Sequence, residues 1–186
     1  MSKGCIICQI ASGEIPSKKV YEDDSVMAVL DVNGSNPGHC FVIPKNHYPI
    51  IEQVPDEELG NHFIVANRIA SAIFEALKVQ GTNIFIRNGI PAGQQVAHFM
   101  INVIPRKEND GVNLQWKPRQ LSEEEMSTVE LKLREQVKGR GIEKAQKAQA
   151  AKPEIPKPEP VTDDEDDYFM RQMRRVTPKI AASLIR

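Results

Sequence analysis

A connection of only two residues, Asp23-Asp24, separates two segments of strand-like composition, residues 19–22 and 25–32. Parallel strands need a crossover of a dozen or more residues, so these two segments must pair antiparallel. A third, mostly apolar segment, residues 39–44, follows a loop dense in turn-forming residues. The short connection therefore favours an α+β fold over a doubly wound parallel one.

A long amphipathic helix is predicted to follow, beginning at the acidic run Asp56-Glu57-Glu58 and stopped by Gly81. Two more strands are predicted at residues 82–87 and 96–104, the second ended by Pro105. Apolar residues recur along the helix at spacings of three and four, which predicts one stripe facing a core: Leu59, Phe63, Ala66, Ile69, Ile73, Phe74 and Leu77.

The chain divides by composition into a globular unit, residues 1–110, and an extension. Within residues 111–140 a capping box, Ser122-x-x-Glu125, predicts a helix that ends at Gly139 and packs on the domain through a narrow apolar seam. Residues 141–167, rich in Pro, Lys and Glu and closed by an acidic run, predict a disordered linker. The seam comprises Met126, Val129, Leu133 and Val137.

The last segment, residues 168–186, is basic and amphipathic. Such segments dock on membranes, nucleic acid, proteins or acidic partners, or pack on the protein's own surface, and the sequence leaves these alternatives open. The formal net charge of −1 gives no global attraction to nucleic acid or membrane. No run of about 18 apolar residues and no secretory signal is found, so we expect a cytoplasmic protein without a transmembrane segment.

Three cysteines in a reducing compartment are not expected to form a disulfide framework. Two of them form Cys5-x-x-Cys8, which indicates metal or redox use. A thioredoxin-type function is disfavoured, because neither a preceding strand nor a βαβ pattern accompanies the motif.

The predicted strand at residues 96–104 carries polar and apolar side chains on alternate positions. One face is wholly apolar and is expected to point into the core: Ala97, Phe99, Ile101 and Val103. The other face carries His98, Met100 and Asn102 beside a glycine-rich loop, which indicates either a pocket or a solvated sheet face.

Several stretches between Cys5 and Arg106 resemble, in collinear order, the histidine triad (HIT) family. The resemblance implies an antiparallel sheet with two helices, usually dimeric through the long helix and the last strands. We therefore predict an α+β, five-stranded antiparallel fold with a long helix, a short N-terminal helix and a C-terminal helical and disordered extension. The matching stretches are Cys5-Ile6-Ile7-Cys8, Gly13-Glu14-Ile15-Pro16, Val20-Tyr21-Glu22-Asp23-Asp24, Leu30-Asp31-Val32, Asn36-Pro37-Gly38-His39, Val42-Ile43-Pro44-Lys45-x-His47, Asn88-Gly89, Ala92-Gly93-Gln94 and Val103-Ile104-Pro105-Arg106.

The family signature alternates three histidines with apolar residues, and here it reads His98-Phe99-Met100-Ile101-Asn102-Val103-Ile104. In the family the middle histidine attacks the α-phosphate and forms a covalent nucleotidyl intermediate. That position is Met100, whose thioether is a poor nucleophile toward phosphate and cannot relay a proton. Rescue by His98, about 6.5–7 Å along the row, or by His39, His47 or Cys40 on other segments, is not expected. The catalytic set is therefore predicted to be empty.

The resemblance also implies a metal site, because in a subset of the family two N-terminal cysteines and two histidines bind zinc. The matching residues are Cys5, Cys8, His47 and His98. A Cys₂His₂ set suits tetrahedral Zn²⁺ and leaves no open position, so the zinc is expected to be structural.

A purine nucleotide such as AMP or GMP is the ligand that the resemblance implies. Asp31 matches the carboxylate that holds the ribose hydroxyls, and Gln95 stands where the family often has serine. We predict a nucleotide-binding protein that is inactive or weakly active. The alternatives are a phosphoramidase or dinucleotide hydrolase with altered chemistry, and a zinc-stabilised dimeric scaffold with a partner-binding tail. By the same resemblance the base-contacting positions are Ile7, Ile10, Val29 and Val32, for which a place in the ordinary core is the alternative. The phosphate-facing positions are Asn88, Gly93, Gln94, Gln95 and Val96.

Overall fold

The computed structural model describes residues 4–138. It divides the chain after Trp116 into two units, which are described separately below. The predicted helix stop at Gly139, the linker at 141–167 and the basic segment at 168–186 lie outside the described residues.

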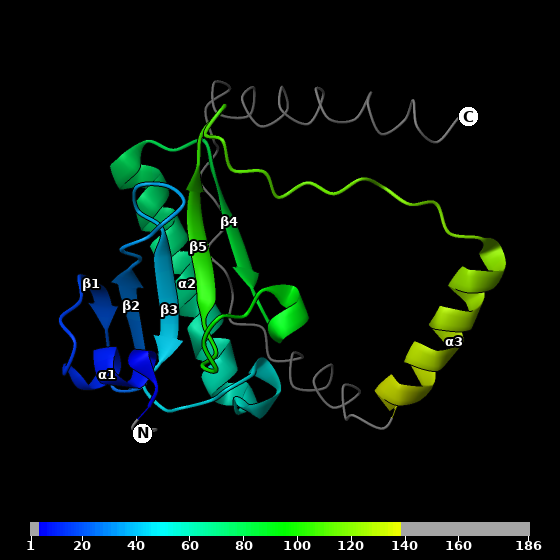
Figure 1. Cartoon of the computed structure of the whole chain (residues 1–186), viewed down its shortest axis with the longest axis horizontal. Coiled ribbons are helices and arrows are strands. Elements are labelled where there is room, and N and C mark those ends of the chain that lie inside the picture. Colours follow the sequence, from blue (N-terminus) through cyan, green and yellow to red (C-terminus); the bar gives the residue numbers. More distant parts are fainter. Residues whose placement is uncertain (1–3, 139–186) are drawn as a thin grey trace, which may run out of the picture. The chain divides into compact units, whose positions relative to one another are not determined.

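The first unit is built on a five-stranded antiparallel sheet with the order β1-β2-β3-β5-β4 (Figure 1). The α+β prediction, with a long helix and a short N-terminal one, is confirmed. The strands are β1 (Lys19–Glu22), β2 (Val26–Leu30), β3 (Cys40–Pro44), β4 (Gly81–Ile86) and β5 (Ile101–Arg106), and the helices are α1 (Ile6–Ser12) and α2 (Asp56–Leu77), with 3₁₀ turns at Ile51–Gln53 and Ile90–Ala92.

The β1–β2 connection is held by one carboxylate. Oδ1 of Asp23 accepts hydrogen bonds from the backbone N–H groups of Ser25 and Val26, at 2.8 and 2.7 Å, and Oδ2 accepts one from the Tyr21 hydroxyl at 2.8 Å. Burial alone would raise the pKa of Asp23, but these hydrogen bonds outweigh it and lower the pKa to about 2. The two-residue turn is therefore fixed by its own side chain.

The sheet is buried on both faces. Alternate residues of β2 point to opposite sides, so that Val26 and Ala28 join the core beneath α2, whereas Met27 and Val29 pack with α1. The short α1 thus covers the face that α2 leaves free, and it carries Cys8 into the second cluster.

The predicted apolar stripe of α2 is only partly right. Ala66, Ile69 and Ile73 are buried, but Phe63 and Phe74 are 44% and 49% exposed. The sheet covers one side of the helix only, and these two side chains lie beyond its reach. The predicted stop is also wrong, because α2 ends at Leu77, where Lys78 adopts a left-handed backbone (φ 51°), and Gly81 begins β4.

The last strand begins later and ends later than predicted. β5 starts at Ile101, and the residues before it bend, with the His98 N–H bonded to the Val96 carbonyl at 2.8 Å and the Phe99 N–H to the Tyr48 carbonyl at 2.6 Å. Ala97 is consequently exposed and does not face the core. Beyond Val103 only β4 pairs with β5, so Pro105, which lacks an N–H, is tolerated inside the strand.

The second unit contains α3 (Glu123–Lys138), and its predicted capping box is confirmed. The Glu125 N–H donates to Ser122 Oγ at 3.2 Å, and the Ser122 N–H donates to Glu125 Oε2 at 2.9 Å. The seam residues are exposed, and the packing of this helix on the domain stays a prediction. Over residues 4–138, no helix has the length and apolarity to cross a bilayer.

Candidate metal-ligand cluster and ligand pocket

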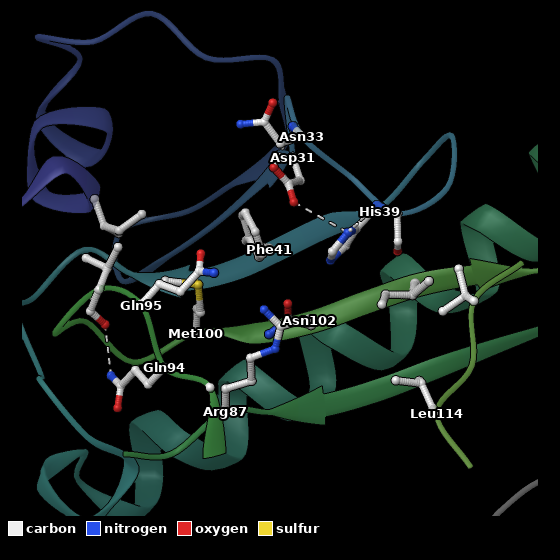
Figure 2. Close-up of a pocket in the computed structure, with 16 residues that line it drawn as sticks. Asp31, Asn33, His39, Phe41, Arg87, Gln94, Gln95, Met100, Asn102 and Leu114 are labelled. Atoms are coloured by element: carbon white, nitrogen blue, oxygen red, sulfur yellow. Dashed lines mark hydrogen bonds and ion pairs between the residues drawn. The ribbon is translucent and has the colours of Figure 1, made fainter. Parts of the chain in front are cut away.

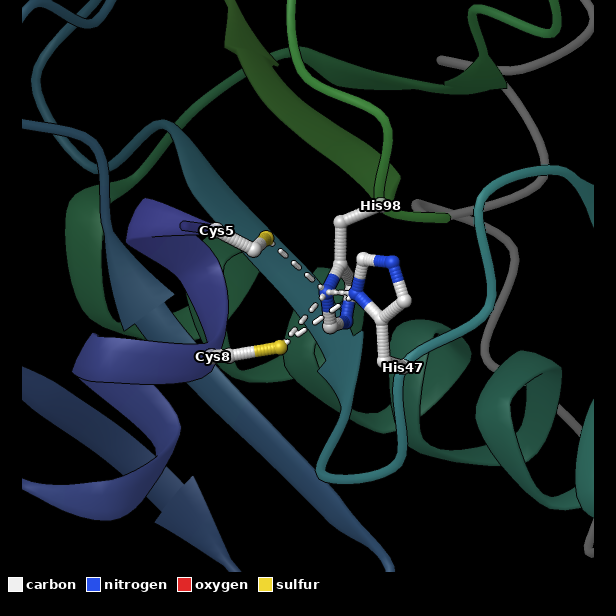
Figure 3. Close-up of side chains that lie close together, drawn as sticks. All are labelled: Cys5, Cys8, His47 and His98. Atoms are coloured by element: carbon white, nitrogen blue, oxygen red, sulfur yellow. Dashed lines mark hydrogen bonds between the residues drawn. The ribbon is translucent and has the colours of Figure 1, made fainter. Parts of the chain in front are cut away.

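Four side chains predicted as metal ligands lie together (Figure 3). Cys5 occupies the position just before α1 and Cys8 lies in the first turn of that helix, His47 follows β3, and His98 precedes β5. Their ligand atoms all lie within 4.8 Å of one another. Three chain segments far apart in sequence therefore meet at one point that can hold a metal ion.

The orientation of His98 is set by its second nitrogen. Nε2 lies 3.1 Å from the Pro44 carbonyl oxygen, which can only accept, so Nε2 carries the proton and Nδ1 faces the sulfur atoms. The side chain is fully buried, and burial lowers the pKa of His98 to about 4, which keeps the imidazole neutral at pH 7.

A second site, a pocket of about 480 Å³, opens on the α1-side face of the sheet (Figure 2). Met100 and Asn102 line it and His98 lies in the cluster, whereas Phe99, Ile101 and Val103 join the α2-side core. The alternation predicted from His98 onward is therefore kept, although β5 itself begins only at Ile101. The pocket is lined by Ile7, Asp31, Asn33, Ser35, His39, Phe41, Arg87, Gly93, Gln94, Gln95, Val96, Met100, Asn102, Ile104, Val112 and Leu114.

Six of the ten positions expected to contact a nucleotide lie in this pocket: Ile7, Asp31, Gly93, Gln94, Gln95 and Val96. The other four lie elsewhere. Val29 is buried in the core under α1, and Ile10 packs against that core. Val32 is 88% exposed outside the pocket lining. The Asn88 side chain donates to Glu52 and accepts from the Ile51 N–H, so it joins two loops.

Asp31 and His39 form the polar end of the pocket. Oδ2 of Asp31 lies 3.5 Å from His39 Nδ1, and Oδ1 accepts from the Asn33 N–H at 2.9 Å. His39 Nδ1 accepts from the Ser35 N–H at 3.3 Å. Burial lowers the pKa of His39, while Asp31 and a hydrogen bond with Asn102 raise it and the charge of Arg87 lowers it further. The imidazole is therefore neutral at pH 7, with its proton on Nε2.

The glycine-rich loop at 89–96 is held by Gln94. Its Nε2 donates to the carbonyls of Pro49 and Val96, at 2.6 and 2.9 Å, and its Oε1 accepts from the Gly89 N–H at 2.7 Å. The backbone N–H groups of Gly93 and Gln94 also donate within the loop, to the carbonyls of Ile90 and Gly89. These groups are already bonded and build the pocket wall.

Sequence reasoning missed half of the pocket lining. The period-two alternation of strand side chains was an available signal for His39 and Phe41, since the alternate residues Cys40 and Val42 are buried in the α2-side core. Arg87 was signalled only by its place just before the predicted phosphate-facing loop. The missed residues are Asn33, Ser35, His39, Phe41, Arg87, Ile104, Val112 and Leu114.

The fold and its two sites define a class of protein: a small α+β domain with a polar ligand pocket beside a Cys/His group that can hold a metal ion. The family model described as "HIT domain" matches residues 12–109, slightly more than half of the chain. The chain therefore belongs to the HIT family, as the motifs predicted.

Individual relatives agree with this assignment. An uncharacterized HIT-like protein of Methanocaldococcus jannaschii is 47% identical over 107 residues, which are 58% of this chain and 82% of that protein. An adenosine 5'-monophosphoramidase of Saccharomyces cerevisiae is 30% identical over 140 residues, 75% of this chain and 86% of that one.

Solved structures show the same fold. A HIT-family protein from Bacillus subtilis has a TM-score of 0.68 at 35% identity, with 72% of this chain and 96% of that chain covered. A Zn-bound histidine triad family protein from Mycobacterium smegmatis has a TM-score of 0.57 at 35% identity, with 62% and 84% covered.

Proposed function

We propose that this protein binds a purine nucleoside monophosphate, AMP or GMP, without forming a covalent intermediate. The observation that carries the proposal is Met100, which lines the pocket at the position that the resemblance gives to the nucleophilic histidine. A thioether is neither a nucleophile toward phosphate nor a proton carrier at neutral pH. The yeast relative named as a phosphoramidase supports a nucleotide as the ligand class.

The rest of the pocket suits a nucleotide. Its volume of about 480 Å³ lies within the range of small-molecule sites. Ile7 and Phe41 supply apolar surface for a base, and the Asp31 carboxylate offers two acceptor oxygens for a vicinal diol.

His39 does not replace the missing nucleophile in this proposal. Its Nδ1 accepts from Ser35, so the neutral imidazole carries its proton on Nε2. That nitrogen is buried and has no hydrogen-bond partner within normal distance limits among the described residues, although the nearby Asn102 side chain raises the pKa of His39. A protonated, buried nitrogen has no lone pair to attack a phosphate and acts as a hydrogen-bond donor instead.

We further propose that Cys5, Cys8, His47 and His98 hold a structural zinc ion. With Zn–N of about 2.0 Å and Zn–S of about 2.3 Å, a regular tetrahedron needs N···N near 3.3 Å and N···S near 3.5 Å. The His47 and His98 Nδ1 atoms are 3.3 Å apart, and three of the four N···S distances are 3.3, 3.5 and 3.7 Å. The Zn-bound relative supports the same metal, and a cytoplasmic location would keep both thiols reduced.

Calorimetric titration of the full chain with AMP and GMP tests binding, and an assay with adenosine 5'-phosphoramidate tests chemistry. We expect binding by the parent protein without turnover. Met100→His should produce measurable turnover, because an imidazole then faces the phosphate. The catalytic rates of sites with and without a nucleophile differ by several orders of magnitude. Met100→Leu is the matched control and should stay inactive. Turnover by the parent through a nucleotidylated protein would overturn the proposal.

A homodimer is also proposed, through the outer face of α2 and the edge strand β4. Phe63 and Phe74 lie three helical turns apart on one side of α2, and Ile84 of β4 is 41% exposed. An edge strand with exposed apolar neighbours is a site for a second sheet. Light scattering should give twice the chain mass for the parent and the single mass for Phe74→Glu, and a monomeric parent would contradict this.

A further inference from the structure

Arg87 follows β4 directly and lines the ligand pocket, although no motif singled it out. Figure 2 shows its guanidinium beside Asn102, on the same side of the pocket as Met100. Its aliphatic stem passes the left-handed Gly93, where an added Cβ would lie 3.6 Å from Arg87 Cδ. Its Cζ lies 5.5 Å from the ring centre of Phe85. The side chain is thus guided into the pocket by its neighbours.

The guanidinium is an unpaired positive charge. Among the residues that the structure describes, Arg106 pairs with Asp110 and Arg119 with Glu125, but Arg87 forms no ion pair. The pocket lining holds two charged side chains, Asp31 and Arg87, at opposite ends (Figure 2). A nucleotide has the matching polarity, because its 2'- and 3'-hydroxyls and its 5'-phosphate are separate polar groups on different sides of the ribose.

Other groups near Arg87 are poor candidates for neutralising an anion. The Gly93 and Gln94 N–H groups donate inside their own loop, and the Gln94 side chain is bonded to three backbone groups. Met100 and Asn102 carry no charge. The charge on a bound phosphate must therefore be met mainly by Arg87.

We infer that Arg87 selects a ligand with a free, doubly charged terminal phosphate over the same nucleotide with its phosphate esterified or amidated. This rests on the proposed nucleotide function. A guanidinium binds two phosphate oxygens side by side. A monoester carries close to two charges above its second pKa of about 6, whereas a methyl ester or phosphoramidate carries one. The pocket then holds a monophosphate as a stable ligand.

The experiment is calorimetric titration of the full chain with adenosine, AMP and adenosine 5'-methyl phosphate at pH 7.5 and pH 5.5. The parent should bind AMP about tenfold more tightly than the methyl ester at pH 7.5, and less so at pH 5.5, where the phosphate gains a proton. Arg87→Gln should bring AMP to the affinity of the ester, and Arg87→Lys should retain part of the preference. Arg68→Gln, which removes an exposed charge on α2 outside the pocket, is the matched control and should match the parent.

Phosphorus NMR gives an independent measurement, because a guanidinium at the phosphate lowers the second pKa of bound AMP in the parent but not in Arg87→Gln. Two failures are distinguishable. If the parent binds neither nucleotide, the proposed function fails and this inference fails with it. If AMP binds and its preference over the ester is the same in the parent and in Arg87→Gln, the inference alone is overturned.

Discussion

Residues 98 to 102 serve two sites of opposite character. At one end, His98 lies fully buried in a four-residue cluster whose possible ligand atoms all lie within 4.8 Å of one another. At the other, Met100 and Asn102 line an open pocket whose charged side chains are Asp31 and Arg87. Both sites lie on the α1 side of the sheet, since Met100 also packs against the cluster that contains Ile7 and Cys8. Different side chains of one segment thus belong to the metal-ligand cluster and to the ligand pocket. We therefore expect that a substitution at one of these two sites can leave the other site unchanged.

The largest expected effect is on the cluster side. Cys8→Ser removes one ligand from the proposed zinc site and should lower the free energy of unfolding by more than about 3 kcal/mol, since metal binding to a closed site is folding free energy. Denaturant unfolding and metal analysis should show zinc falling from about one equivalent to a small fraction, while AMP affinity in the remaining folded protein changes little.

Cys40→Ala is the control for this variant, because it removes a buried thiol that lies outside the cluster and bonds only to the Gly38 carbonyl. It should keep the full zinc content. Equal stability of Cys8→Ser and the parent, or chelator-washed protein that melts like untreated protein, would break the comparison by showing that the cluster does not support the fold.

On the pocket side, Asp31→Asn should weaken AMP binding about tenfold to a hundredfold, because an amide offers the ribose one acceptor oxygen where the carboxylate offers two charged ones. The Asn33 N–H keeps an acceptor in this variant, so the loop should fold as before. Titration with 2'-deoxy-AMP tests the ribose contact directly. The parent should bind 2'-deoxy-AMP more weakly than AMP, whereas the variant should bind the two nucleotides with similar affinity. Equal discrimination by both proteins would remove Asp31 from the ribose site.

Two neighbouring glutamines of the pocket loop differ in their contacts, because Gln94 is hydrogen-bonded to the backbone whereas the Gln95 side chain is exposed. Gln94→Ala leaves the Gly89 N–H and the Pro49 and Val96 carbonyls without their partner and should cost about 1–2 kcal/mol of stability. Gln95→Ala removes an exposed side chain and should change stability by less than about 0.5 kcal/mol. Urea unfolding of both variants measures the difference, and similar losses would show that Gln94 does not hold the loop.

Much of the fold was predictable because its signals are local. The two-residue connection at Asp23-Asp24 and the acidic start of α2 each act within a few residues, and both gave the right element. The stop of α2 and the start of β5 were predicted wrongly, since Lys78 takes a left-handed backbone without being glycine and Phe99 bonds to the distant Tyr48 carbonyl. Hydrogen bonds between segments that are far apart in the sequence override the local pattern. Such bonds leave no local signal from which they could be predicted.

The cluster was easier to anticipate than the pocket. Cysteine and histidine at metal-ligand spacing are chemically conspicuous, and all four residues meet. The pocket is assembled from side chains that are ordinary in sequence, such as Phe41 and Arg87, whose role depends on where β3 and β4 end. Val32, expected beside a base, projects away because the turn after β2 carries it outside the pocket.

The smallest expected effect concerns pH and again separates the two regions. Burial lowers the pKa of His39 below its usual 6.5, against the opposing pull of Asp31, so below pH 6.5 the unfolded chain takes up this proton before the folded one does. The contribution of His39 to stability is therefore complete above pH 6.5 and is lost as the pH falls toward the lowered folded-state pKa. His39 lies in the pocket and outside the Cys5, Cys8, His47 and His98 group, so a substitution of His39 leaves the proposed metal ligands in place. His39→Gln should lose less stability than the parent between pH 7.5 and pH 5.5, by under about 1 kcal/mol, in paired urea titrations.

Identical pH slopes for the two proteins would mean that His39 is already solvated in the folded state, and the pocket end formed by Asp31 and His39 would then be more open than its geometry indicates.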